Sequence, residues 1–370
     1  MSRVALSRIL LTQLQSSSTE NLLGISRLRR VATVGIFLML ALTAAAFPQN
    51  QGLPALIRDG QDALDTGDFL RAARDFEQAH QLSPENLPVQ RGLLLSYLQQ
   101  NRLAEAEQIG QAAVARWPKD AELQHYVGLV YFKKSQNAAA VAALRQSVNL
   151  DPTYPDVHFD LALVLLSDSN YSEAANELEK AIKLNPKEAL PHVLLGRAYQ
   201  NTNRTVQAVE QFQIALRLDP GVSLGHYHLG FAYASLGRNA EAIAEYEKEL
   251  QHSPNNPTVL YQLGHRQLES GDLKSAVEHL KKAIEIDSNH ADSFYDLGKA
   301  LLMQGDADDA IPALRRAIEL KPSDPTSHYQ LARALEKAGK KDEAKQELET
   351  FATLKKAQPV TGGMASGPIQ

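Results

Sequence analysis

The sequence contains no cysteine, and only 6% of its 370 residues are aromatic. The absence of cysteine excludes disulfide bonds, thiolate nucleophiles, cysteine-ligated zinc and a lipid-modified N-terminal cysteine. No charge of one sign dominates, because 38 basic and 43 acidic residues leave a net charge of −5. No basic run lies within residues 53–358. Nucleic acid is therefore not expected as a partner, since binding to its phosphates requires clustered lysine and arginine.

The sequence also lacks the short motifs that carry common catalytic and cofactor chemistry. It has no His-Glu-x-x-His pair, no phosphate-binding glycine loop, no dinucleotide fingerprint and no serine nucleophile elbow. The sequence therefore predicts neither an enzyme nor a protein with a bound cofactor.

What the sequence does contain is a fixed period of 34 residues. A period of this length is typical of stacked-repeat proteins, in which each short unit buries its apolar face against its neighbours. Counting back 31 residues from Pro84 places the start of the first unit at Leu53. The residue at position 32 of the unit recurs every 34 residues without insertion or deletion. It is proline in all but one case: Pro84, Pro118, Pro152, Pro186, Pro220, Pro254, Ser288 and Pro322.

Each unit has residues of fixed size at three positions. Position 8 is glycine or alanine in eight units, position 20 is alanine in all nine, and position 24 is large and apolar in eight. The second unit is the exception, with Leu94 at position 8 and Gly110 at position 24. Each unit has two apolar-periodic stretches of about 13 residues, enough for three to four helical turns. Small residues of position 8 and position 20 predict a close approach of the two helices.

A glycine, asparagine or serine separates the two stretches of every unit. Glycine and asparagine tolerate the left-handed backbone conformation that commonly ends a helix. We therefore expect helix ends at Gly67, Asn101, Ser135, Ser169, Asn203, Gly237, Gly271, Gly305 and Gly339.

Segments such as Tyr295-Asp296-Leu297-Gly298, Asp309-Ala310-Ile311 and Leu320-Lys321-Pro322 resemble the tetratricopeptide repeat. The resemblance implies an all-α fold, a right-handed superhelical α-solenoid of antiparallel helix pairs. It also implies a concave groove, lined mainly by the first helices, that binds peptide segments of partner proteins. The nine expected repeats are residues 53–86, 87–120, 121–154, 155–188, 189–222, 223–256, 257–290, 291–324 and 325–358.

The two ends of the chain differ from the repeats. Arg27, Arg29 and Arg30 precede an uncharged run from Val31 to Phe47, which ends in small residues. This order predicts that residues 1–46 are a cleaved signal peptide or an uncleaved signal-anchor, followed by a linker at 47–52. A non-exported apolar helix is the alternative. We expect an exported, periplasmic or cell-envelope protein, free or anchored to the inner membrane by residues 31–47. The tail, 359–370, is expected to be disordered.

The resemblance also implies which residues line the groove, because positions 5 and 9 of the family face its concave side. Tyrosine occupies position 5 in the last four repeats, and it joins apolar area to one polar group with little rotamer freedom to lose. Neighbouring cations would pair with acidic partner groups. The expected groove residues are Tyr227, Tyr261, Tyr295, Tyr329, Arg197, Phe231, His265, Lys299 and Arg333, with an apolar part at Leu95, Leu129, Phe159 and Leu163. The alternative interpretation of the tyrosines is inherited packing without a ligand.

The histidines at position 4 (His158, His192, His226 and His328) are interpreted as packing residues. His226 and His228, two residues apart on a helix, point about 200° apart and cannot bind one metal ion together. The sequence therefore predicts no metal site. It predicts a non-enzymatic scaffold or adaptor that binds protein or peptide segments, some of them acidic. An accessory factor of envelope assembly, secretion, pilus or polysaccharide export, or a self-associating array, is the alternative. The partner and the oligomeric state stay open.

Overall fold

The computed structural model describes residues 52–357. The predicted signal segment, nearly all of the linker and the predicted tail lie outside these residues. Eighteen α-helices and no strand are found between residues 52 and 357, in agreement with the all-α solenoid prediction. None of these eighteen helices is long and apolar enough to cross a membrane. The described residues form two compact units that divide after Pro186.

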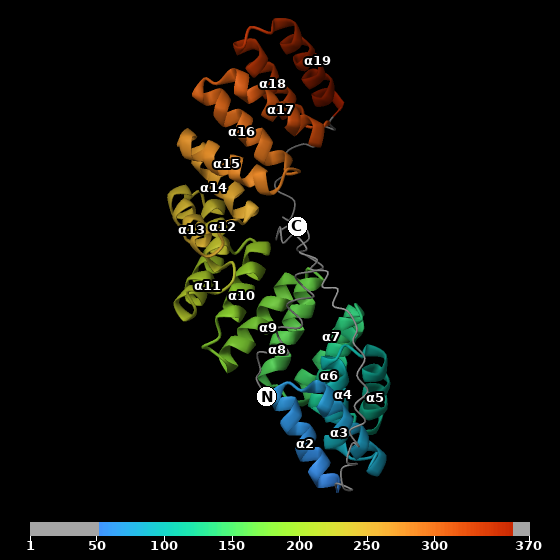
Figure 1. The fold of residues 1–370 in the computed structure, drawn as a ribbon. Coiled ribbons are helices and arrows are strands. Elements are labelled where there is room, and N and C mark those ends of the chain that lie inside the picture. The colour runs from blue at the N-terminus through green and yellow to red at the C-terminus, as the bar shows by residue number, and fades with distance from the viewer. Residues whose placement is uncertain (1–51, 358–370) are drawn as a thin grey trace, which may run out of the picture. The chain divides into compact units, whose positions relative to one another are not determined.

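The first unit contains four helix pairs, coloured blue to green in Figure 1. Consecutive helices pack on one another, both within a pair and between neighbouring pairs. Its helices are α2 (Leu53–Thr66), α3 (Phe69–Leu82), α4 (Leu87–Gln99), α5 (Leu103–Arg116), α6 (Ala121–Lys133), α7 (Asn137–Leu150), α8 (Pro155–Ser167) and α9 (Tyr171–Leu184).

The second unit contains five helix pairs, coloured green to red in Figure 1. It carries nine of the thirteen expected groove residues. Its helices are α10 (Ala189–Asn201), α11 (Thr205–Leu218), α12 (Gly225–Ser235), α13 (Asn239–His252), α14 (Pro257–Ser270), α15 (Leu273–Ile286), α16 (Ala291–Gln304), α17 (Ala307–Leu320), α18 (Pro325–Lys337) and α19 (Lys341–Ala357).

The turn inside each pair is set by one residue with left-handed backbone. All nine expected positions have positive φ, from +57° at Ser169 to +103° at Gly305, which confirms the prediction. At Asp68, Asn170 and Asp272 the residue after this turn also caps the second helix, because its side chain accepts a hydrogen bond from the backbone of the first turn.

The first helices are started by the residue that precedes each repeat. The side chains of Asn86, Asp120, Asn256 and Asp324 accept hydrogen bonds from backbone N–H groups in the first turn that follows. These groups have no partner within the helix, so the caps stabilise each helix start by about 1 kcal/mol. Eight of the nine first helices begin at the first residue of their repeat. The sixth, α12, begins two residues late, after a left-handed Leu224 (φ +58°).

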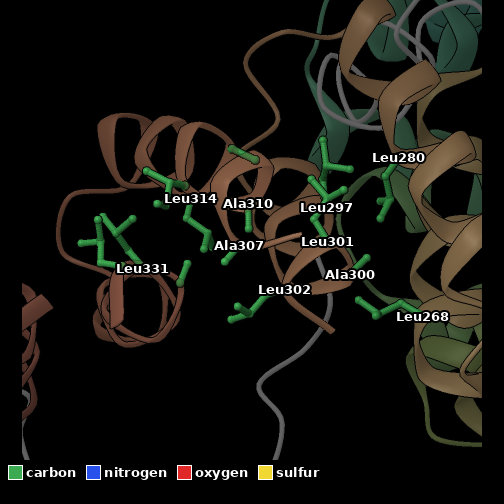
Figure 2. Close-up of a cluster of buried hydrophobic side chains, with 14 of the residues drawn as sticks. Leu268, Leu280, Leu297, Ala300, Leu301, Leu302, Ala307, Ala310, Leu314 and Leu331 are labelled. Atoms are coloured by element: carbon green, nitrogen blue, oxygen red, sulfur yellow. The ribbon is translucent and has the colours of Figure 1, made fainter. Parts of the chain in front are cut away.

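The core of each pair depends on the small residue at position 8 meeting the large one at position 24. A Cβ placed on Gly298 would lie 2.4 Å from Cγ of Leu314, so only glycine permits this approach. Ala310, at position 20, is fully buried beside Leu314. Figure 2 shows Leu314, Ala310 and Leu297 within one apolar cluster that joins several helices of the second unit. Packing of this kind excludes water from the pair and holds the first helices in place.

Candidate functional site

The apolar part of the expected groove lies in the first unit and is buried. Leu95, Leu129 and Leu163 are 3%, 1% and 0% exposed, and Phe159 is 8% exposed. These side chains pack in the interior of repeats two to four, where a partner does not reach them. The expectation that they form an accessible apolar surface is therefore corrected: large apolar side chains at successive first helices are withdrawn from water, as the hydrophobic effect favours.

The remaining expected residues lie in the second unit, on its first helices. Positions 5 and 9 are one helical turn apart, so they lie on the same side of their helix. Tyr261 and His265 form such a pair on α14, Tyr295 and Lys299 on α16, and Tyr329 and Arg333 on α18. We call these six residues, with Tyr227 and Phe231 on α12, the first-helix face of the second unit. Arg197 lies on α10 and is half-buried.

The four tyrosines differ in how much of the side chain meets solvent. Tyr227 is 8% exposed, Tyr261 and Tyr295 are half-buried, and Tyr329 is 41% exposed. Burial raises the pKa of the Tyr227 hydroxyl to about 12, an effect that the Arg197 cation partly opposes. Burial also raises the pKa of Tyr261 and of Tyr295. All three are therefore neutral hydroxyls that donate hydrogen bonds at physiological pH.

Ring contacts and apolar packing hold the tyrosines of α14 and α16 in place. The ring of Tyr261 lies 4.6 Å from that of His290 and 5.8 Å from that of His265, measured between centroids. Tyr295 packs against the buried apolar cluster of Figure 2. Side chains fixed in this way lose little conformational freedom when a partner binds.

The three basic residues of the face differ in whether they are already paired. His265 Nδ1 lies 2.6 Å from Oδ2 of Asp296, and its Nε2 lies 3.6 Å from a carboxylate oxygen of Glu269. Within residues 52–357, neither Lys299 nor Arg333 forms an ion pair; Arg333 donates only to the Gln330 amide oxygen, at 3.2 Å. Two cations of the face are therefore without an acidic partner among the described residues.

The histidines at position 4 do more than pack. In four repeats the position-4 histidine Nδ1 lies 2.6–2.8 Å from the side-chain oxygen at position 23 of the same repeat, which joins the first helix to the second. The repeats with this histidine are the ones with glutamate or glutamine at position 23, a sequence signal that could have predicted the contact. The pairs are His158–Glu177, His192–Gln211, His226–Glu245 and His328–Glu347.

His228 behaves differently from these. It is packed against Phe212, with the two rings stacked at 5.6 Å. Burial lowers the pKa of its imidazole to about 3, and the Arg197 cation acts in the same direction. His228 is thus neutral at physiological pH and adds no charge to the first-helix face.

A polar network in the first unit was not predicted from the sequence. Arg91 pairs with Asp120, at the end of its own repeat, and with Glu122 of the next repeat. Fully buried His125 has Nε2 2.6 Å from Oδ2 of Asp160 and Nδ1 3.1 Å from the Tyr154 hydroxyl. These charge-assisted contacts join repeats two, three and four: Arg91 and Glu122 are half-buried, whereas His125 and Asp160 are buried.

The described part of the chain contains no group of three or more histidine, aspartate or glutamate side chains arranged to hold a metal ion. Comparison with known protein families identifies the repeats. Family models of the tetratricopeptide repeat match residues 58–121, 193–257, 261–325, 301–352 and 155–188, and a TPR repeat model matches 128–169. The chain belongs to the tetratricopeptide-repeat family. No curated protein matches it.

Several solved tetratricopeptide-repeat structures resemble the chain at low identity. MamA is 23% identical and covers 44% of this chain and 95% of its own, with a TM-score of 0.42. YrrB, described as a TPR protein with an unusual peptide-binding site, is 22% identical and covers 50% and 95%, with a TM-score of 0.46. A tetratricopeptide-repeat protein from Parabacteroides merdae is 19% identical and covers 67% and 98%, with a TM-score of 0.45. At these identities the likeness concerns the fold alone.

Proposed function

We propose that this tetratricopeptide-repeat protein is a non-enzymatic scaffold whose second unit binds an extended, acid-bearing segment of a protein partner. The family and its helix-pair fold support an interaction scaffold. The observation that carries the finer proposal is the first-helix face, where half-buried or exposed tyrosines alternate with Lys299 and Arg333, neither of them in an ion pair within residues 52–357. Aromatic and arginine side chains are the residue types that dominate binding energy at protein interfaces.

We place the protein in the cell envelope, exported by residues 1–46 and either released or held at the inner membrane by residues 31–47. The order of three arginines, an uncharged run and small residues supports this localisation. Acidic segments of envelope proteins would then be the partners, and residues 31–47 the only contact of the chain with a membrane. Fusion of residues 1–52 to alkaline phosphatase, active only after export, tests this: an inactive fusion would contradict export.

The binding proposal is tested by selection of 12-residue peptides from a random display library against the full chain. We expect the selected peptides to be enriched in aspartate and glutamate. Replacement of Tyr261 and Tyr295 by alanine is expected to weaken the best peptide at least about tenfold, because both rings are preorganised in the face. Fluorescence anisotropy of the labelled peptide gives the dissociation constant.

Charge-reversal variants distinguish peptide binding at the first-helix face from general electrostatic attraction of an acidic peptide to the protein. Lys299→Glu and Arg333→Glu should each weaken the selected peptide, more at low than at high salt, since exposed charges are screened. Lys281→Glu makes the same charge change at an exposed lysine on α15, a second helix, and should leave binding unchanged. Equal loss in all three variants, or no loss in the two face variants, would sink the proposal.

A further inference from the structure

Repeat six departs from the residue types that the other repeats have at position 27. Six of the nine repeats have alanine there, one has Ser147 and the last has Phe351; repeat six alone has an ionisable residue, Glu249. Position 27 lies against the start of the first helix of the same repeat, as the Ser147 hydroxyl shows by donating to the backbone oxygen of Ala121 at 2.7 Å. Glu249 is 4% exposed, so its carboxylate is buried where seven of the other eight repeats place a methyl group or a hydroxyl.

The helix start that faces Glu249 is itself irregular. α12 begins at Gly225, at position 3, whereas all other first helices begin at position 1. Leu224, the residue before it, is the single non-glycine outside the nine pair turns with a left-handed backbone in residues 52–357. A left-handed conformation is sterically unfavourable for a residue with a Cβ. The buried carboxylate and the strained start therefore occur at one place.

A hydrogen bond connects the two irregularities. The backbone N–H of Tyr227, in the first turn of α12, donates to Oε2 of Glu249 at 3.2 Å. The carboxylate thus caps α12 from the opposite helix, in place of the missing first turn. His226 on α12 and His252 on α13 lie close enough to the Glu249 carboxyl to lower its pKa. His226 Nδ1 in turn lies 2.6 Å from Oε2 of Glu245 on α13. Glu245 accepts from Lys248 at 2.7 Å, and the rings of His226 and His252 stack at 6.0 Å.

We infer that Glu249 is a positioning residue of the first-helix face: by capping a shortened α12, it fixes Tyr227 in a recessed place and gives repeat six a different surface from repeats seven to nine. This inference rests on the proposed function, because the face is the binding site. Tyr227 is 8% exposed, and its ring packs 6.1 Å from that of Tyr246, while its equivalents in the next three repeats are half-buried or exposed. The face then presents Phe231 at repeat six and tyrosine hydroxyls beyond it.

The effect of Glu249→Ala on stability separates a positioning role from a purely structural role. If the side chain only held the repeat together, alanine at this position would destabilise the chain. If it holds a strained start in place, Glu249→Ala lets α12 extend to Ser223 as in the other repeats, and the thermal midpoint rises. A local rule broken at the cost of stability is typical of functional positions.

The experiment compares wild type, Glu249→Ala and Glu249→Gln by tyrosine nitration with tetranitromethane and by amide hydrogen exchange, both read by mass spectrometry on the full chain. In wild type we expect Tyr227 to be protected and Tyr329 to be nitrated. In Glu249→Ala we expect nitration of Tyr227 to rise to the level of Tyr261, and the amides of residues 223–227 to exchange more slowly. Glu249→Gln retains an acceptor oxygen, so Tyr227 stays protected.

The inference is overturned if Tyr227 stays protected in Glu249→Ala, or if Glu249→Gln exposes it as much as Glu249→Ala does. Neither readout needs a partner, so the inference and the proposed function fail separately. A library that yields no binding peptide refutes the proposed function and leaves the role of Glu249 intact. Where a selected peptide exists, Glu249→Ala should weaken its binding although the thermal midpoint of the protein rises. If Glu249 served stability alone, the variant would bind more weakly and also unfold at a lower temperature.

Discussion

Leu94 and Gly110 reverse the usual order of a small residue at position 8 and a large residue at position 24 between α4 and α5, the second helix pair. In six other repeats glycine at position 8 receives a large side chain from position 24; here Leu94 fills the space from the opposite side, and its Cδ1 lies 3.4 Å from where a Cβ on Gly110 would stand. Leu94 is fully buried. The two departures from the repeat pattern therefore compensate each other, and neither weakens the pair.

This relationship predicts non-additive mutational effects. Leu94→Ala leaves a cavity and should cost about 2–5 kcal/mol of the free energy of unfolding. Gly110→Leu overfills the same space, where its Cβ would also lie 2.7 Å from Cγ2 of Val127, and should cost about 1–3 kcal/mol. The double variant should be less destabilised than the sum, measured by urea unfolding. As a control, Leu94→Ala combined with Gly298→Ala in the other unit should be additive.

Glu177 should contribute to the stability of the first unit above mildly acid pH. Its burial raises the pKa of the carboxyl, but hydrogen bonds from His158 and Lys180 outweigh burial, and the folded-state pKa is lowered from 4.5. A lowered pKa stabilises the folded state above 4.5, and this contribution is lost as pH falls through the folded value. Glu177→Gln should therefore lower the thermal midpoint at pH 7 and flatten its fall below pH 4.5. The matched change at exposed Glu247 should do neither.

Glu249 should show the opposite pH dependence. Burial raises the pKa of its carboxyl above 4.5, against the backbone hydrogen bond from Tyr227 and the nearby His226 and His252. For a raised pKa, the stabilising contribution is complete below 4.5 and is lost as pH rises through the folded value. Glu249→Gln should thus stabilise the chain at pH 7, with a gain that shrinks toward pH 4.5. Thermal unfolding by circular dichroism at several pH values measures it; a gain that grows on acidification would contradict the assignment.

The left-handed serines offer a simple stabilising change. Ser135 and Ser169 have φ of +59° and +57°, a conformation that glycine adopts without the steric cost of a Cβ. Ser135→Gly should raise the free energy of unfolding by roughly 1 kcal/mol. Ser172→Gly, in the first turn of α9, makes the same change where the backbone is helical and should lower it slightly, by at most about 0.5 kcal/mol. Equal signs for the two variants would show that the turn conformation is not the cause.

Much of the fold was predictable because it repeats. Nine turn residues could be placed from composition and spacing, since left-handed backbone restricts the residue type and the period fixes its position. The contact between Leu94 and Gly110 was visible as two exceptions within one repeat, but its geometry was not. The residues of the first-helix face stay a prediction of the binding site. The exposed fraction of each tyrosine depends on neighbours that no single position reveals.

The errors and omissions have physical causes. The repeat positions of Leu129 and Leu163 predict surface residues, but their size and apolar character favour burial, and both are buried. The contact between His125 and Asp160 spans 35 residues and follows no single repeat position. Glu249 could have been singled out from the sequence, because every other residue at position 27 is alanine, serine or phenylalanine. The one residue that departs from the repeat pattern was the signal at this position.

The uneven exposure of the four tyrosines gives the first-helix face a direction. Chemically equal side chains at equal intervals would let an extended partner bind in several registers, each shifted by one repeat, with similar energy. Tyr227, recessed at one end, and Tyr329, open at the other, make these registers unequal. If the proposed function holds, an extended segment bound along this face has one preferred alignment and one preferred polarity, even though the repeats that contact it are nearly identical.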